Sequence, residues 1–326
     1  MKNILITITI LAALNIGLKA QLFPILGGQR AGISTAEFLK IGVGGRSSAL
    51  GEAFVAISND VSALYWNPAG LVQFNDNQVM FSHNKWVVDI NHDFLGAVYH
   101  LDGENAVGLA VTSLSMNDMP VTTEYQPFGT GEYFGYRDVA IALTYSRKMT
   151  EQFSFGGTIR YIDETLDKVK MRGVMIDLGT YYWTGLGTSR FAVSVSNFGN
   201  QLAADGKVLL IGKRSNSEWQ SFSPPTVFRI GFAFEPYKTD LNMLTASIQL
   251  NHPNDNSENV STGLEYTYDN MLFLRGGYKF NVEEQNYSFG AGVNVPLGFA
   301  NVTCDYAYQN FVRLGTAHRF SIILGL

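Results

Sequence analysis

The chain has 326 residues, a formal net charge of −5 at pH 7, 46% hydrophobic residues and only 16% charged residues, whereas a soluble domain usually carries about 25% charged residues. The acidic balance does not suit a nucleic-acid partner, and the single cysteine, Cys304, excludes an internal disulfide and a cysteine-based metal cluster. Beyond its start the chain has no apolar run long enough for a membrane helix. Because only helices and closed barrels satisfy every backbone polar group in lipid, the composition favours a transmembrane β-barrel.

Residues 1–20 have the pattern of a signal peptide. A basic start is followed by an apolar stretch from Ile4 to Leu14, and a small residue, Ala20, precedes Gln21. The stretch is about half of the roughly 20 residues that a spanning helix needs, which argues against a membrane anchor. We therefore expect export and cleavage between Ala20 and Gln21.

Residues 21–77 precede the first strand and form a segment that is rich in small residues and lacks a ten-residue alternation. We expect this segment to be a hatch folded into the barrel mouth and held by hydrogen bonds and charge contacts rather than by an apolar core. Arg46 is its most conspicuous charge. Its expected partners are Asp177, Glu265 or Asp305, and the open alternative is that Arg46 faces periplasmic water.

From Gln78 onward, segments of about ten residues alternate apolar and polar side chains, which is typical of lipid-spanning strands. In the segment from Phe153 to Tyr161, for example, apolar side chains at odd positions are separated by small or polar ones, and a period of two predicts a strand. We therefore predict an all-β fold, a transmembrane antiparallel barrel over residues 78–326. Its fourteen strands are expected near 78–87, 92–101, 105–115, 137–148, 152–162, 173–183, 189–198, 225–235, 240–250, 259–268, 271–280, 286–295, 299–309 and 315–326.

The connections between these strands differ in length according to parity. Those after even-numbered strands are tight turns, whereas two after odd-numbered strands are long, at residues 116–136 and 199–224. Short periplasmic turns and longer outer loops are typical of outer-membrane barrels. We therefore expect both long loops outside the cell and both chain termini in the periplasm.

The alternation also separates a lipid face from a lumen face. The predicted lipid face includes Phe228, Ile230, Phe232, Phe234, Val302, Cys304, Tyr306 and Tyr308. The charged side chains predicted to face the lumen are Arg160, Asp177, Arg229, Glu265, Arg275, Asp305 and Arg319, with Lys279 beside them and glycines between them. On this pattern we expect no packed apolar core, and a lumen of fourteen strands is too wide to fill itself, so it needs a plug or conducts.

Between Phe38 and Leu71 the sequence reads GGR, ALG, AFVA, ND and ALYWNPAGL in that order, with Gly45, Arg46, Leu50, Gly51, Asn67, Pro68, Ala69, Gly70 and Leu71 at its fixed points. This run resembles the N-terminal signature of the PorV/PorQ family of outer-membrane proteins, a branch of the FadL-like barrels. The resemblance implies a fourteen-stranded barrel with an N-terminal hatch in the bacterial outer membrane. It also implies an association with type IX protein secretion, whose components or cargo would then be partners.

Two functions remain open. The first is a protein-interaction role in or near type IX secretion, which aromatic residues such as Tyr125 and Phe128 in the loop 116–136 favour, because exposed aromatics usually contact something. The alternative is passage of a hydrophobic small molecule, as in the FadL branch. We expect no enzyme activity, since no Gly-x-Ser-x-Gly elbow appears, and no cofactor or metal, since the five histidines lack ligand spacing.

Overall fold

The computed structural model describes residues 32–206, 208–209, 215–216, 219–283 and 285–326. The predicted cleavage site at Ala20 and Gln21 lies outside the described residues. In the described part, no helix is long and apolar enough to cross a membrane.

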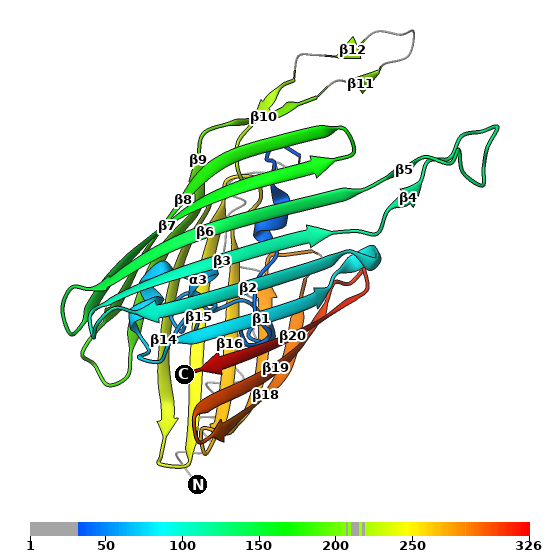
Figure 1. Ribbon diagram of the computed structural model, residues 1–326. Helices are drawn as coiled ribbons and strands as arrows, with labels where there is room; N and C mark the ends of the chain where they lie inside the picture. Colours follow the sequence, from blue (N-terminus) through cyan, green and yellow to red (C-terminus); the bar gives the residue numbers. More distant parts are fainter. Residues whose placement is uncertain (1–31, 207, 210–214, 217–218, 284) are drawn as a thin grey trace, which may run out of the picture.

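The fold is a closed antiparallel β-barrel of fourteen strands, which confirms the predicted fold class (Figure 1). The first strand pairs with the last, Gln78 opposite Gly325, and the ring closes where β8 pairs with β9. The barrel strands are β1 (Gln78–Lys85), β2 (Asn91–His100), β3 (Asn105–Ser115), β6 (Tyr136–Lys148), β7 (Phe153–Leu166), β8 (Val169–Trp183), β9 (Arg190–Gly199), β14 (Val227–Lys238), β15 (Asn242–Pro253), β16 (Asn259–Tyr268), β17 (Leu272–Phe280), β18 (Tyr287–Leu297), β19 (Ala300–Asn310) and β20 (Thr316–Gly325).

The two ends of the barrel differ as the connection lengths predict. The long connections carry the short strands β4 (Met119–Pro120) and β5 (Tyr133–Phe134), and then β10 (Leu202–Asp205), β11 (Val208–Leu209), β12 (Ser215–Asn216) and β13 (Ser221–Phe222). Both excursions project from one end of the barrel, called here the long-loop end (Figure 1). The end of β20 lies at the opposite, short-turn end.

Alternation of the side chains produces an oily outside and a polar inside. Along β14, Phe228 and Phe232 are exposed, whereas Arg229 and Gly231 between them are buried. The same pattern puts Cys304 outside and Asp305 inside on β19. The predicted register is therefore correct. An apolar belt on a closed barrel is what a bilayer requires, so the protein is an integral outer-membrane barrel.

One strand pair is longer than predicted. The sequence prediction ended at residue 162 and resumed at residue 173, but β7 and β8 continue to a tight turn at Asp167, whose φ is +52°. Asp163 pairs across the two strands with Arg172, whose Nε lies 2.6 Å from the aspartate Oδ2. Polar residues occupy both faces of this extension, so apolar alternation stops although strand pairing does not.

Inside the barrel lie the short helices of the hatch, defined here as residues 34–74 (Figure 1). They are η1 (Glu37–Lys40), α2 (Gly45–Ala49), α3 (Ala63–Trp66) and η2 (Pro68–Val72), and a fifth short helix, η3 (Val87–Asp89), joins β1 to β2. The expectation of a hatch without an apolar core is wrong. Leu50, Phe54 and Trp66 of the hatch are buried in one apolar cluster with wall residues such as Met80 and Phe94. Sequence alternation missed it because the hatch supplies most of these side chains from irregular backbone.

Candidate functional site

The hatch rests on the barrel wall at two pairs of glycines, and the first pair lies under Asn67 and Pro68. Gly156 of β7 and Gly179 of β8 are directly opposite each other across the two strands. A Cβ atom on Gly156 would lie 2.5 Å from the carbonyl carbon of Pro68, and one on Gly179 would collide with Oδ1 of Asn67. Only glycine lets the hatch backbone approach the wall this closely.

Asn67 and Pro68 are held in place by local hydrogen bonds. The Asn67 side chain accepts from the Ala69 backbone N–H at 3.1 Å, which caps η2, and Pro68 occupies the first helical position, where no N–H is needed. The Asn67 Nδ2 donates to the carbonyls of Val55 and Thr180, both at 3.1 Å. One side chain therefore joins the hatch helix, the hatch loop and the wall strand β8. Gly70 and Leu71, which complete the motif, are buried.

The second glycine pair lies under Leu50 and Gly51, on a different part of the wall. Gly263 of β16 is opposite Gly277 of β17, and a Cβ atom on either would meet the backbone of Leu50 or Gly51. Gly51 itself has a φ of +62° and donates its N–H to Ser288 Oγ at 2.9 Å. The two parts of the motif, Leu50-Gly51 and Asn67-Pro68, thus each rest on a pair of facing glycines, on separate strand pairs.

Gly45 places the neighbouring helix against β19 and β20. Its N–H donates to Ser321 Oγ at 3.0 Å, and a Cβ atom on it would lie 3.0 Å from Cβ of Asp305. This close approach positions the next side chain, Arg46, over the inner wall of the barrel.

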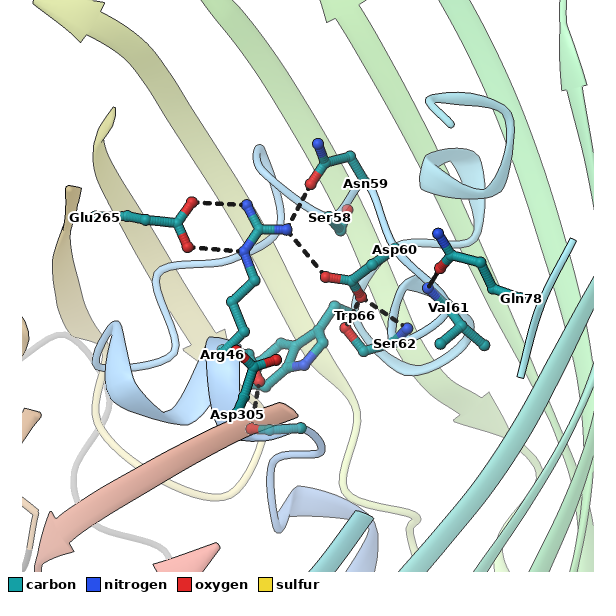
Figure 2. A network of polar contacts seen from close by, with 12 residues as sticks. Arg46, Ser58, Asn59, Asp60, Val61, Ser62, Trp66, Gln78, Glu265 and Asp305 are labelled. Atoms are coloured by element: carbon teal, nitrogen blue, oxygen red, sulfur yellow. Dashed lines mark hydrogen bonds and ion pairs between the residues drawn. The ribbon is translucent and has the colours of Figure 1, made fainter. Parts of the chain in front are cut away.

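Arg46 is the centre of a chain of charges that joins the hatch to the wall (Figure 2). Its Nε and Nη2 each lie 2.9 Å from one carboxylate oxygen of Glu265, a bidentate pair. On its other side, Nη1 lies 3.0 Å from Asp60 Oδ2 and 2.6 Å from Asn59 Oδ1. Of the three partners the sequence allowed, the structure therefore selects Glu265, and bidentate geometry makes this contact both directional and strong.

The charge chain continues along the wall beyond Glu265. Arg275 donates from Nε to Glu265 at 2.6 Å and from Nη1 to Asp305 at 2.5 Å. The two arginines are thus shared among three carboxylates inside the barrel, those of Asp60, Glu265 and Asp305. Buried charges persist only when they are paired and hydrogen-bonded, and this network meets both conditions.

The remaining lumen charges predicted from sequence are also buried on the inner face. Arg160 pairs with Asp177 at 2.6 Å, next to a β-bulge where β9 carries one extra residue opposite Asp177. Arg319 contacts Ser48 of the hatch, and Arg229 lies over the ring of Trp66 at 5.6 Å from its centroid. The structure therefore separates the predicted lumen charges instead of bringing them into one site: Glu265, Arg275 and Asp305 form one cluster, Arg160 and Asp177 form a pair, and Arg229 and Arg319 lie apart from both.

A small polar cavity opens beside Trp66 at the long-loop end. Its volume is about 170 Å³, and its lining residues are Lys40, Glu52, Trp66, Val227, Arg229, Asn251, Pro253, Asn256, Asn259 and Lys279. Lys279 Nζ lies 2.5 Å from Glu52 Oε2. Burial alone would lower the pKa of Lys40, but its hydrogen bonds to Asp255 and Glu37 outweigh burial and raise that pKa, so Lys40 is charged at neutral pH.

Several of these residues were not identified from the sequence. Lys40, Glu52 and Asp60 lie within or beside the signature, but without the fold nothing distinguishes a hatch charge that meets the wall from one that meets water. Asp255, in the turn between β15 and β16, is buried and binds Lys40 at 2.8 Å. Their signal is charge within a segment of small residues, the same signal that identified Arg46.

The model of an uncharacterised protein family, UPF0164, matches residues 28–159, less than half of the chain. No curated protein matches. Among solved structures, the toluene transporter TbuX of Ralstonia pickettii is 12% identical with a TM-score of 0.57, and the toluene transporter TodX of Pseudomonas putida is 14% identical with a TM-score of 0.56. In both comparisons 87% of this chain and 97% of the other chain are covered. A FadL homologue of Pseudomonas aeruginosa is 12% identical with a TM-score of 0.53, covering 90% of this chain and 97% of the other.

These likenesses establish the fold of the FadL-like outer-membrane barrels. They agree with the branch to which the sequence resemblance points, but the three named structures carry no type IX secretion description. The narrower resemblance to PorV and PorQ stays a prediction.

Proposed function

We propose that the protein is a gated channel of the outer membrane, in which the hatch must move before a small molecule passes. The observation that carries this proposal is the seating of the hatch on the two glycine pairs and on Glu265. In this proposal the hatch closes the lumen through backbone packing and hydrogen bonds. Such contacts are non-covalent, so they can break and re-form when the hatch moves.

The substrate class we propose is a small hydrophobic molecule. Support comes from the FadL-like fold, since TbuX and TodX are described as toluene transporters. A second apolar cluster supports it from this chain. At the long-loop end, Phe38 and Leu39 of the hatch pack with wall residues, and Ile90 and Met171 beside them are only partly buried. Partly exposed apolar side chains at the mouth suit the capture of an apolar solute.

The test is an engineered disulfide between the hatch and the wall, which can be formed by oxidation and broken by reduction. A Cβ atom on Gly231 of β14 would lie 3.3 Å from Cβ of Ala56 in the hatch, close to the separation of about 3.5–4.5 Å found in disulfides. The variant Ala56→Cys with Gly231→Cys also carries Cys304→Ser, which removes the native thiol, and Val55→Ala, which makes room beside Gly231.

In proteoliposomes we expect the oxidised variant to lose toluene uptake and the reduced variant to regain it. The matched control carries Cys304→Ser and Val55→Ala alone and should be insensitive to reductant. Uptake that is equal in the oxidised and reduced states would show that the hatch need not move, and uptake absent even from wild-type protein would remove the substrate class.

A protein-interaction role is the second candidate, and a specific surface favours it. The hairpin of β4 and β5 ends in Tyr125 and Phe128, which are 93% and 100% exposed. Exposed aromatics at a projecting tip suit a partner protein. Replacing both by serine should abolish a cross-linked complex in the native outer membrane if this role holds, while leaving toluene uptake unchanged.

A further inference from the structure

The cavity beside Trp66 holds a buried arginine for which the described residues supply no carboxylate partner. Arg229 is only 6% exposed, its Nη1 donates to Ser196 Oγ at 2.7 Å, and its guanidinium lies over the Trp66 ring. Within the described chain, no carboxylate lies within ion-pair distance of Arg229. The contacts that the described residues make with its guanidinium are with a hydroxyl and an aromatic face.

The other two cations of the cavity are balanced. Lys279 is paired with Glu52, and Lys40 is shared between Asp255 at 2.8 Å and Glu37 at 2.5 Å. The Glu37 side chain is half exposed, so water screens its charge. Once these pairs are set aside, the cavity retains one net positive charge, that of Arg229.

Neutral hydrogen-bonding groups lie around the same space. Asn259 accepts a hydrogen bond from Asn251 at its Oδ1, at 2.8 Å, and its Nδ2 has no hydrogen-bond partner among the described residues. Arg229 and Asn259 line the same cavity from strands on either side of β15. An unbalanced guanidinium together with an amide N–H donor is a donor set that suits an oxygen anion. A buried charge without a counter-ion is unfavourable, so the site gains stability when an anion enters.

We propose that this cavity binds a small oxyanion, a carboxylate or a phosphate, with Arg229 as its counter-charge. The cavity is lined by the hatch through Lys40, Glu52 and Trp66 and by the wall through Arg229 and Asn259. An anion bound there bridges hatch and wall, and a ligand that binds only the closed arrangement stabilises it. The site is independent of the transported molecule and is expected even if the barrel carries no hydrocarbon.

The test uses the purified full-length mature protein in detergent micelles. Sodium phosphate and sodium succinate are titrated at constant ionic strength, with chloride replaced, and calorimetry and thermal unfolding are followed. We expect saturable binding of at least one anion and a rise in the unfolding temperature. Stronger binding of phosphate assigns the site to phosphoryl groups, and stronger binding of succinate assigns it to carboxylates.

Two substitutions locate the site. Arg229→Gln should weaken the affinity at least tenfold, whereas Arg229→Lys, which keeps the charge, should retain part of it. The matched control is Arg172→Gln, which removes an exposed arginine outside the barrel lumen and should bind as wild type does. Absence of saturable binding of both anions to wild-type protein, or equal binding by Arg229→Gln, overturns the proposal.

A measurement on wild-type protein covers the case in which Arg229→Gln fails to insert. Crystals soaked in selenate report the anion by anomalous scattering. A peak within hydrogen-bonding distance of the Arg229 guanidinium supports the site, and peaks only elsewhere, or none, contradict it.

Discussion

At the scale of single residues, the hatch is held by a few side chains whose geometry leaves little freedom. Arg46 reaches Glu265 and Asp60 at the same time, and Asn67 reaches three backbone groups. The sequence indicated both residues through the signature and identified Glu265 as one possible partner. It did not indicate Asp60, because that residue lies on the hatch itself. The hatch backbone is irregular, and the periodicity of a sequence does not predict how irregular backbone folds.

Replacing Arg46 by methionine should destabilise the closed hatch. Its guanidinium bonds to carboxylates in a mostly buried setting, where such bonds contribute about 2 kcal/mol. Glu265 keeps Arg275 as a partner, which limits the loss. The loss in stability of the closed hatch is measured by urea titration of protein folded in lipid vesicles, with hatch fluorescence as the signal. Arg172→Met is the control, since it breaks an exposed pair and should change little. Equal effects of the two substitutions would show that Arg46 faces solvent.

Two adjacent glycines on β7 test whether the hatch requires a glycine where it contacts the wall. Gly156 faces the hatch, whereas a Cβ atom on Gly157 would meet only Leu178, at 3.6 Å, and the Asp177 carbonyl, at 3.8 Å. Gly156→Val should leave the barrel inserted but displace the hatch, raising the conductance in planar bilayers. Gly157→Val should behave as wild type. Wild-type conductance in the Gly156 variant would mean that the hatch tolerates a side chain at its seat.

At the scale of secondary structure, the sequence predicted the barrel strands well and the hatch poorly. Each predicted strand is present, because one lipid face and one lumen face impose a period of two along the membrane-spanning part. The extension of β7 and β8 past residue 162 was missed where the chain leaves that environment. The helices of the hatch were not predicted, since none exceeds five residues and their apolar side chains follow no period.

The connections give a testable orientation. Gly129 lies in the connection that carries β4 and β5, and Asp205 ends β10 in the other long connection, whereas Gly103 and Asn270 occupy short turns. Epitope tags at Gly129 and Asp205 should be labelled by antibody on intact cells, and tags at Gly103 and Asn270 only after the outer membrane is opened. The reverse labelling pattern would show that the short-turn end, and not the long-loop end, lies outside the cell.

At the scale of the whole molecule, the fold is a fourteen-stranded barrel whose interior holds its own N-terminal segment. The hatch contributes the larger part of the apolar cluster, and the wall contributes side chains such as Met80, Phe94 and Ile323. Strand pairing runs around the complete ring without the hatch. The barrel and its plug are therefore separable in principle, which is the arrangement that gating requires.

Single-channel recording on a variant that lacks residues 36–74 tests this claim most directly. The ring of strands and the lipid face are intact in this variant, so it should insert into the membrane. With the lumen vacated, we expect large, long-lived conductance steps in planar bilayers, where the wild-type protein shows small or rare ones. An inserted variant that conducts no better than wild type would contradict the account, because the hatch would then not be what closes the barrel.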